Sequence, residues 1–403
     1  MKLKDKLVAE GQQHLLSVLD SLNKEDRAKL TRQLEAIDWD ILSLWSNPED
    51  LSGKGRVQPI TGLSLKDIQL RRDEFAQIGS KAIRGGKVGA VLLAGGQGTR
   101  LGSDAPKGAY DIGLTRPLYI FEQLIHNLLE VCNQCKTCVP LFIMTSQKND
   151  GETKQFFEKH NYFGYPTGYV RFFAQDMAPA VDLNGKLLLE TKSQLALSPN
   201  GNGGWYSSLV RADVLKDFPD IEWLNVFAVD NVLQRIADPV FVGATIASGF
   251  NSGAKFVRKT NPYERVGALC LEDGLPSVIE YYELTDDMAN QVDKDGRLVY
   301  SFGVILNYLF SVSKLKETVE KRIPVHVVKK KIPYIDETGR YFKPEIENGY
   351  KFETLILDMV RLMESCLPFE VVREKEFAPI KNKTGVDSVE SAQALLEQNG
   401  IKL

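Results

Sequence analysis

The chain reads VGAVLLAGGQGTRLG from residue 88 to residue 102. The first six residues form an unbroken apolar run, which is typical of a strand buried on both faces of a parallel sheet. A glycine-rich segment follows directly, so we expect it at the carboxyl end of that strand, where open α/β sheets bind ligands. Because Gly95, Gly96 and Gly98 have no Cβ, the backbone there can take a positive φ and approach an anion closely. The stretch therefore predicts an α/β fold with an anion-binding loop.

Strand and helix signals alternate along much of the remaining chain. Further apolar runs that fit buried strands lie at 139–144, 169–173 and 223–229. Helical spacing separates them, at 117–131, 149–159 and 239–248. Strands separated by helices predict an open, largely parallel sheet with helices on both faces. Residues 264–303 are richer in strand signals, and we expect an antiparallel layer there.

The sequence predicts three consecutive parts. Leucines at helical spacing predict a small helical subdomain over residues 1–46, and turn residues at 47–53 begin an irregular wrap that includes one helix near 65–79. These two segments form the first part, residues 1–85. The second part, 86–345, carries the glycine-rich loop, and the third, 346–403, is a C-terminal segment that ends in a helix.

Composition excludes several classes of protein. The chain has 403 residues, of which 43% are hydrophobic and 26% charged, which is ordinary for a soluble globular protein. A net charge of −3 does not indicate the excess of positive charge that binding to nucleic acid or to a membrane surface would favour. We find no apolar run long enough to span a bilayer and no signal peptide. Five cysteines are too few for a disulfide framework, so we expect a reducing compartment, the cytoplasm.

The sequence does not match the residue spacing of two common phosphate-binding motifs. A dinucleotide-binding loop needs Gly-x-Gly-x-x-Gly, but the glycine after Gly96 and Gly98 is Gly102, so a nicotinamide-dependent dehydrogenase is the weaker alternative. A P-loop needs a Lys-Ser/Thr pair after its glycines, which this stretch lacks. Arg100 instead supplies a planar fork suited to phosphate, and Lys107 a compact positive charge. Glycines followed by an arginine and a lysine suit the binding of a triphosphate that a nucleophile attacks.

The string from Leu93 to Gly102, with Pro106 and Lys107, resembles the signature of sugar-nucleotide pyrophosphorylases. Within them it is most similar to the eukaryotic UDP-N-acetylglucosamine pyrophosphorylase family. Matching motifs recur over about residues 12–382, at 106–114, 175–177, 201–206, 229–231, 278–281, 330–334 and 376–382. The resemblance implies a Rossmann-like (GT-A-like) nucleotidyltransferase fold with its catalytic domain in 86–345. It also implies a uridylyltransferase that converts UTP and N-acetylglucosamine 1-phosphate into the UDP-sugar and diphosphate.

The same resemblance implies a role for each matching residue. The catalytic residues would be Arg100 and Lys107. The nucleotide-binding residues would be Leu93, Ala94, Gly95, Gly96, Gln175, Gly201, Asp230 and Lys351, with Gln175 and Gly201 reading the uracil. The sugar-binding residues would be Asn202, Glu280, Tyr281 and Lys381.

Asp230 is also the residue expected to hold a metal ion. It follows an apolar run, so its carboxylate should lie at the ligand-binding edge of the sheet. Mg²⁺ takes few protein carboxylates and completes its shell with water and phosphate, so one aspartate suffices, with Mn²⁺ as an alternative. A sugar 1-phosphate has a second pKa of about 6 and is largely ionised at neutral pH, so the nucleophile needs no general base. Catalysis would consist of positioning and charge neutralisation.

The sequence departs from the family pattern beside the sugar. The family's Asn-Ala-Gly-Asn reads Ser301-Phe302-Gly303-Val304 here, and Val304 cannot hydrogen-bond a hydroxyl or acetamido group. A UDP-glucose or broad-specificity UDP-sugar pyrophosphorylase therefore stays an alternative. A non-catalytic sugar-nucleotide sensor is the alternative from another class, although a sensor would tolerate changes at Arg100 and Lys107, which are both retained.

Two further features bear on assembly and metal binding. Family members usually carry an additional β-rich C-terminal domain, most of which this chain lacks, so we expect a monomer. Cys132, Cys135 and Cys138 form a Cys-x-x-Cys-x-x-Cys run without a fourth nearby ligand, and we interpret them as structural. The expected partners are UTP, a sugar 1-phosphate, a UDP-sugar and diphosphate, with neither nucleic acid nor membrane.

Overall fold

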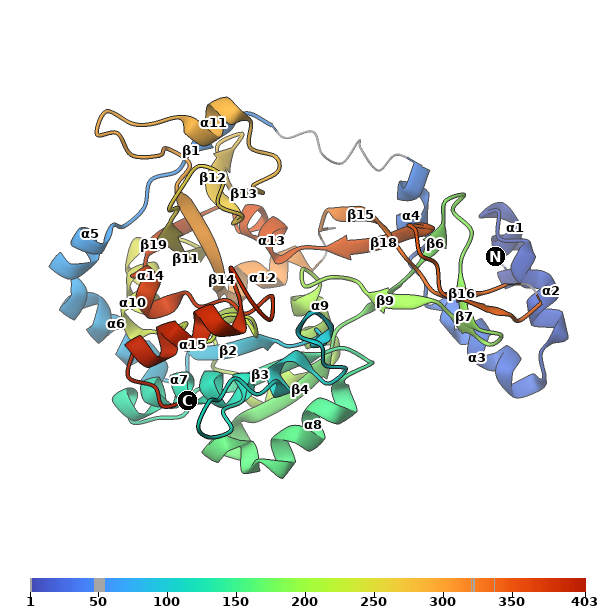
Figure 1. The fold of residues 1–403 in the computed structure, drawn as a ribbon, viewed down its shortest axis with the longest axis horizontal. Helices are drawn as coiled ribbons and strands as arrows, with labels where there is room; N and C mark the ends of the chain where they lie inside the picture. The colour runs from blue at the N-terminus through green and yellow to red at the C-terminus, as the bar shows by residue number, and fades with distance from the viewer. Residues whose placement is uncertain (1, 47–54, 320, 322, 337) are drawn as a thin grey trace. The chain divides into compact units, whose positions relative to one another are not determined.

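The computed structural model describes residues 2–46, 55–319, 321, 323–336 and 338–403. Its contacts divide the chain into two compact units (Figure 1). Unit 1 comprises residues 1–53, 176–204 and 323–356, and unit 2 comprises 54–175, 205–322 and 357–403. These units cut across the three consecutive parts expected from the sequence. The turn predicted at 47–53 lies outside the described residues.

A large mixed sheet forms the frame of unit 2. Four parallel strands make its centre, in the order β10 (Trp223–Ala228), β2 (Val88–Leu93), β3 (Leu141–Thr145) and β4 (Val170–Ala174). Next to β10 lies the antiparallel strand β14 (Phe302–Ser311), which also pairs with β11 (Ser252–Arg258) and β12 (Ala268–Glu272). The predicted open mixed α/β sheet is therefore confirmed.

The strand-rich segment after residue 264 adds antiparallel strands, as expected, and these strands join the main sheet. β12 and β13 (Leu275–Ile279) form a hairpin, and β12 joins the main sheet through β14 and through β1 (Val57–Pro59). Strand β19 (Cys366–Glu370) pairs in parallel with β11. The segment extends the existing sheet because β12, besides pairing with β13 and β1, also pairs with β14 at Ala268 and Gly303.

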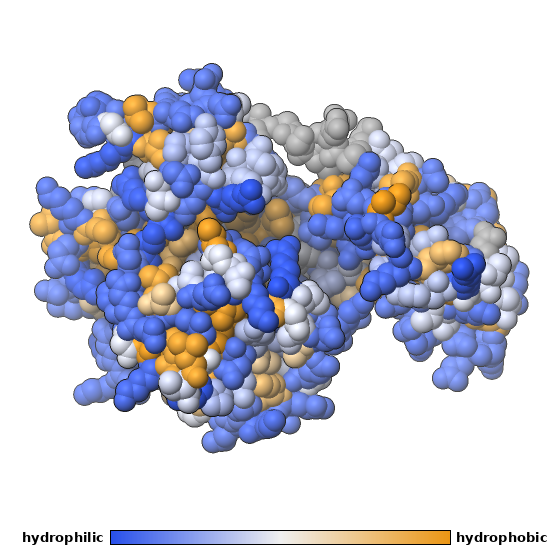
Figure 2. All heavy atoms as spheres, viewed as in Figure 1, coloured by the Kyte–Doolittle hydropathy of each residue, from blue (hydrophilic) through white to orange (hydrophobic). Residues whose placement is uncertain are grey.

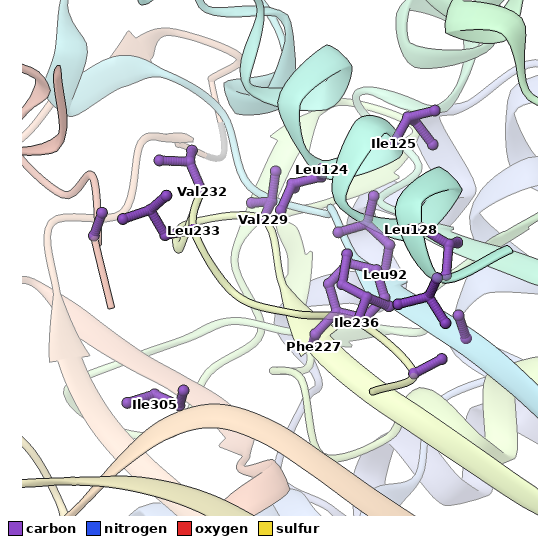
Figure 3. Close-up of a cluster of buried hydrophobic side chains, with 14 of the residues drawn as sticks. Leu92, Leu124, Ile125, Leu128, Phe227, Val229, Val232, Leu233, Ile236 and Ile305 are labelled. Atoms are coloured by element: carbon purple, nitrogen blue, oxygen red, sulfur yellow. The ribbon is translucent and has the colours of Figure 1, made fainter. Parts of the chain in front are cut away.

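Helices cover both faces of this sheet, as the sequence predicted. On one face Val88, Ala90 and Leu92 share a buried cluster with the helices α6 (Arg72–Arg84), α7 (Ile120–Cys135), α8 (Asp150–Lys159) and α10 (Pro239–Ser248). Figure 3 shows the α7 side chains facing Leu92 and the loop that follows β10. On the other face α9 (Trp205–Arg211) stacks Trp205 on Phe310 of β14, with ring centroids 6.0 Å apart.

Shorter elements complete unit 2. The helices are α5 (Leu65–Leu70), α11 (Asp286–Asn290), α12 (Val312–Thr318), α13 (Ile356–Leu362), α14 (Arg373–Glu376) and α15 (Val389–Gln398). The 3-10 turns are η2 (Thr99–Leu101), η3 (Lys107–Ala109), η4 (Asn161–Gly164), η5 (Thr167–Tyr169) and η6 (Val214–Asp217). In the described residues, no helix is long and apolar enough to cross a membrane.

Unit 1 joins the N-terminal helices to strands from two later stretches. The helices are α1 (Leu3–Ala9), α2 (His14–Ser21), α3 (Lys24–Glu35) and α4 (Trp39–Leu42), followed by η1 (Ser43–Ser46). Their buried leucines pack with residues 178–195 and 350–352 in one cluster. The strands are β5 (Met177–Pro179), β6 (Val181–Asp182), β7 (Leu189–Thr191), β8 (Gln194–Leu195), β9 (Leu197–Pro199), β15 (Val325–Lys330), β16 (Tyr334–Ile335), β17 (Tyr341–Phe342) and β18 (Gly349–Thr354).

The surface and the cysteines fit an ordinary globular protein. On the face drawn in Figure 2, most of the surface of each unit is hydrophilic, and hydrophobic residues form small separate groups. Cys132 and Cys135 are buried in the α7 core, where Cys132 Sγ lies 3.5 Å from Tyr165 Oη. Burial raises the pKa of the Cys135 and Cys138 thiols, which disfavours reactive thiolates.

Candidate active site

The glycine-rich loop leaves the carboxyl end of β2 and closes on itself. The Ala94 amide donates to Met144 O at 2.8 Å, the Gly98 amide to Ala105 O at 3.0 Å, and the Lys107 amide to Gly96 O at 3.2 Å. The expectation of a positive φ at Gly95, Gly96 and Gly98 was wrong, because the glycine of this loop with positive φ is Gly102, at 77°. Gly102 ends the turn η2, where the left-handed conformation favours glycine.

Two glycines of the loop have different surroundings. A Cβ on Gly95 would collide with the side-chain amide of Gln175, which is buried and follows β4. A Cβ on Gly96 would have no heavy atom within 4 Å. A Cβ on Gly95 would therefore displace the Gln175 side chain, whereas Gly96 presents bare backbone to open space. Gly96 is therefore the better place for close approach of a phosphate.

Asn149 fixes this loop, and the sequence reasoning did not identify it. Its side chain is fully buried, and Nδ2 donates to Ala94 O at 3.0 Å and to Gly96 O at 3.3 Å. Its Oδ1 accepts from the Ser146 amide at 2.7 Å and the Ser146 hydroxyl at 2.9 Å. Asn149 directly precedes helix α8, a position at which asparagine is a common helix N-cap. No local signal distinguishes an asparagine that holds a distant loop.

Lys107 and Asp230 form the central ion pair of the site. Lys107 Nζ lies 2.7 Å from Asp230 Oδ1, and the side chains are 13% and 36% exposed. They are 123 positions apart in the chain, but β2 and β10 are neighbouring parallel strands, so the segments after them meet at one edge of the sheet. Gln175, after β4, belongs to the same edge. The lysine predicted to bind phosphate and the aspartate predicted to bind a metal ion thus lie together beside the glycine loop.

The backbone around Asp230 is fastened to the C-terminal segment of unit 2. Asp230 O accepts from the Ile380 amide at 2.9 Å. The Asn231 side chain donates to Glu376 O at 2.7 Å and accepts from the Ala378 amide at 2.9 Å. These bonds fix the Asp230 backbone and leave its carboxylate facing Lys107.

The other predicted residues of unit 2 lie in varied settings. Arg100 is exposed on η2, and the described ion pairs do not include it. Lys381 Nζ lies 3.0 Å from Asp387 Oδ2. Tyr281 is 41% exposed and packs edge-on against Tyr282.

Glu280 and Val304 point toward the same spot. A Cβ on Gly267 would lie 3.7 Å from Glu280 Oε2 and 3.6 Å from Val304 Cγ2. Glu280 follows β13, and its amide donates to Glu283 at 2.7 Å. An acceptor and an apolar group therefore face one small region beside a glycine.

Gly201, Asn202 and Lys351 belong to unit 1. Gly201 has a φ of 86°, and a Cβ there would collide with the Thr354 backbone, so glycine is required. Asn202 Oδ1 accepts from the Ile356 amide at 2.9 Å, which commits that oxygen to the fold. Lys351 lies in β18, paired with Val328. The roles of all these residues remain predictions.

Asp230 fits a metal ion that relies on its substrate for ligands. Among the described residues, no group of three or more His, Cys, Asp or Glu side chains could enclose a metal. The protein would therefore offer one carboxylate, and the remaining ligands would be phosphate oxygens and water, which is a set that Mg²⁺ accepts. Soft metals that need several nitrogen or sulfur ligands do not fit.

Comparison with known proteins agrees with this architecture. A family model described as UTP–glucose-1-phosphate uridylyltransferase matches residues 56–403. The chain is 39% identical over 399 residues to the UDP-N-acetylglucosamine pyrophosphorylase of Saccharomyces cerevisiae, covering 94% of this chain and 82% of the yeast protein. It is 37% identical over 423 residues to the human UDP-N-acetylhexosamine pyrophosphorylase-like protein 1, covering 98% and 83%.

A solved structure extends the likeness to the fold. The UDP-N-acetylglucosamine pyrophosphorylase of Trypanosoma brucei, in complex with an inhibitor, matches with a TM-score of 0.84 at 27% identity. The match covers 98% of this chain and 84% of that one. The resemblance inferred from the motifs is confirmed, and the chain belongs to the UTP–glucose-1-phosphate uridylyltransferase family.

Proposed function

We propose that this protein is a uridylyltransferase that converts UTP and N-acetyl-α-D-glucosamine 1-phosphate into UDP-N-acetylglucosamine and diphosphate. The observation that carries the proposal is the Lys107–Asp230 pair, with Nζ and Oδ1 2.7 Å apart beside the glycine loop. The relatives named UDP-N-acetylglucosamine pyrophosphorylase support this choice of sugar.

The chemistry requires little of the protein beyond placement and charge. An oxygen of the sugar 1-phosphate forms a bond to the α-phosphorus of UTP. The bond from that phosphorus to the oxygen bridging the β-phosphate breaks, and its electron pair leaves with diphosphate. The attacking phosphate is already ionised, with a second pKa of about 6, so no proton is removed in this step. This agrees with a site that combines cations, backbone amides and one carboxylate.

Each predicted site residue then has a stated task. Gly96 lets the backbone approach the phosphates, and Gln175 and Gly201 read the uracil edge. Lys107 leaves Asp230 and neutralises charge that develops on the phosphates, and Arg100 contributes its guanidinium to the same charge. When bound, the divalent ion, Mg²⁺ with Mn²⁺ as the alternative, would be held by Asp230 and would neutralise further phosphate charge.

Sugar choice is the point at which a second candidate has support. Val304 and Glu280 both approach Gly267, and an apolar side chain there offers no hydrogen bond to an acetamido group. This favours a UDP-glucose or broad-specificity UDP-sugar pyrophosphorylase as the alternative. Val304→Asn should then raise the preference for N-acetylglucosamine 1-phosphate over glucose 1-phosphate, and unchanged selectivity would remove Val304 from the sugar contact.

The deciding experiment measures diphosphate release from UTP and Mg²⁺ with three acceptors in parallel: the 1-phosphates of N-acetylglucosamine, N-acetylgalactosamine and glucose. We expect the fastest release with N-acetylglucosamine 1-phosphate. Preference for glucose 1-phosphate would support the alternative. No release with any of the three, from a protein that still binds UDP-sugars, would support the non-catalytic sensor.

We also infer a cytoplasmic monomer. All five cysteines are free thiols, which suits a reducing compartment. Sedimentation velocity checks the oligomeric state, and a mass near twice 45.1 kDa would contradict the monomer.

A further inference from the structure

A cavity lies in unit 2, and none of the predicted substrate-binding residues lines it. Its volume is about 330 Å³, at the lower end of the range for ligand pockets. Its walls come from α5, α6, α7, the loop between β10 and α10, and the segment from the end of β19 through α14. Nothing in the proposed reaction uses it.

Most of the cavity lining is polar, but one part of it, called here the floor, is apolar, and the rim carries cations. Its floor includes five buried side chains, Ile68, Leu233, Val240, Phe369 and Val371. Arg72 and Lys375 are exposed, and they also line the cavity. Neither takes part in any ion pair that the structure describes, so both charges remain available for a ligand.

The acidic residues of the lining are largely compensated. Asp238 and Glu376 contact the buried Lys255 Nζ at 3.6 Å and 2.6 Å. Glu370 accepts from Arg258 Nε at 3.2 Å. Glu130 is the remaining lining acid, and it is exposed at the surface. The positive charges of Arg72 and Lys375 therefore exceed the negative charge of Glu130, the lining acid that has no ion pair among those described.

The loop that walls this cavity also carries Asp230. It runs from Val229 to Asp238, and the half-buried side chain of Asn127 and the buried side chain of Gln234 hydrogen-bond to its backbone. Asn127 Nδ2 donates to Val232 O at 2.9 Å and to Gln234 O at 3.1 Å. Gln234 Nε2 donates to Ala228 O at 2.7 Å and to Asn231 O at 2.8 Å. A hydrogen-bonded segment thus connects the cavity wall to the candidate metal carboxylate.

We propose that this cavity is an effector site for a small amphipathic anion. Its carboxylate or phosphate head lies between Arg72 and Lys375, and its short hydrocarbon chain covers the floor. Occupancy moves the loop from Val229 to Asp238 and so changes the affinity of Asp230 for its metal ion. The binding site stands without the proposed function, whereas the coupling rests on the metal role proposed for Asp230.

The binding test uses hexanoate and hexyl phosphate as probes on the full chain, with hexylamine as the cationic control, by calorimetric titration. Val372 lines the cavity and is 42% exposed, so Val372→Trp should block it at little cost to folding. Val386→Trp, at an 83% exposed position outside the cavity, is the matched control. We expect both anions to bind the wild type and Val386→Trp equally, and Val372→Trp at least about tenfold more weakly.

The charge requirement has its own pair of variants. Arg72→Gln with Lys375→Gln should weaken hexanoate about three- to thirtyfold, as expected for two exposed ion pairs. Lys294→Gln with Arg297→Gln, two exposed cations outside the lining, should leave it unchanged. Equal binding by Val372→Trp and wild type, or equal binding of hexylamine and hexanoate, would overturn the site. Thermal melting of each variant shows that it is folded.

The coupling test measures Mn²⁺ affinity with and without saturating hexanoate, in the absence of nucleotide. We expect a shift of about fivefold, and linkage requires the same factor in hexanoate affinity when metal is added. Asp230→Asn should keep hexanoate binding and lose the metal linkage. Hexanoate binding that leaves Mn²⁺ affinity unchanged would overturn the coupling, and it is a result distinct from any failure of the transferase assay.

Discussion

Replacing Lys107 with methionine should tighten metal binding to the free protein while it slows the reaction. Lys107 Nζ lies 2.7 Å from Asp230 Oδ1, so the lysine occupies the carboxylate proposed for the metal. A metal ion must therefore displace this ammonium group before it reaches Asp230. Methionine retains much of the length of the side chain and removes its charge.

The magnitude follows from the geometry of the pair. Two unit charges 2.7 Å apart attract by roughly 6 kcal/mol at an effective dielectric constant near 20. Water reaches both groups, at 13% and 36% exposure, and hydrogen bonds to charged groups contribute a net of about 1.5–3 kcal/mol. Because about 1.4 kcal/mol is a factor of ten, Lys107→Met should bind Mn²⁺ about tenfold more tightly or better. Turnover should fall about 10²- to 10³-fold, because charge stabilisation in the transition state is lost.

The assay is a Mn²⁺ titration of the nucleotide-free protein by electron paramagnetic resonance, at physiological ionic strength. Lys314→Met is the matched control, since Lys314 is 12% exposed and lies 2.8 Å from both Glu317 and Glu364, outside the site. It should leave Mn²⁺ affinity unchanged. Unchanged or weaker Mn²⁺ binding by Lys107→Met would refute the reasoning, and Asp230 would no longer be the metal ligand.

Three further predictions test how the loop is held and how burial acts on ionisation. Gly95→Ala should lower the free energy of unfolding by about 1–3 kcal/mol, because its Cβ meets the Gln175 amide. Gly96→Ala should keep wild-type stability and weaken UTP binding, because its Cβ meets nothing in the protein. Denaturant titration measures the stability of both variants, and calorimetry measures their affinity for UTP. Asn149→Ala should cost about 1–3 kcal/mol and raise the KM for UTP, because it leaves the buried carbonyl of Ala94 without its donor and removes one of the two donors to Gly96 O; an unchanged KM would contradict its role in holding the loop. Burial raises the pKa of Tyr206 to about 12, so the unfolded chain ionises first as pH rises. The free energy of unfolding should therefore fall by about 1.4 kcal/mol from this group by pH 11, and Tyr206→Phe should remove that share of the alkaline slope.

The elements with strong local signals were predictable from the sequence. The apolar run from Val88 to Leu93 is strand β2, and the helix predicted at 239–248 is α10, with the predicted bounds. Continuous apolar runs and helical periodicity report burial within a few residues of chain. They do not report which strands pair, so the sequence did not show that the hairpin of β12 and β13 joins the main sheet.

The structural role of each residue in the glycine-rich loop was not predictable from local patterns. The sequence indicated flexibility at Gly95, yet the structure shows that the amide of Gln175, 80 positions later, lies within 2.4 Å of where a Cβ would be. Asn149 gave only the signal of a helix cap, although it holds the loop through Ala94 and Gly96. Contacts between residues far apart in the chain leave no mark in the local pattern of either segment.

The sequence by itself determined the family, the α/β class and the set of candidate residues, because motif and periodicity are properties of short segments. Only the tertiary structure decided that Lys107 meets Asp230, that the N-terminal helices share a core with residues 178–195 and 350–352, and that a cavity lies behind the Asp230 loop. The physical reason is that strand order and helix packing are fixed by the burial of whole faces against one another. That burial depends on segments separated by more than a hundred residues.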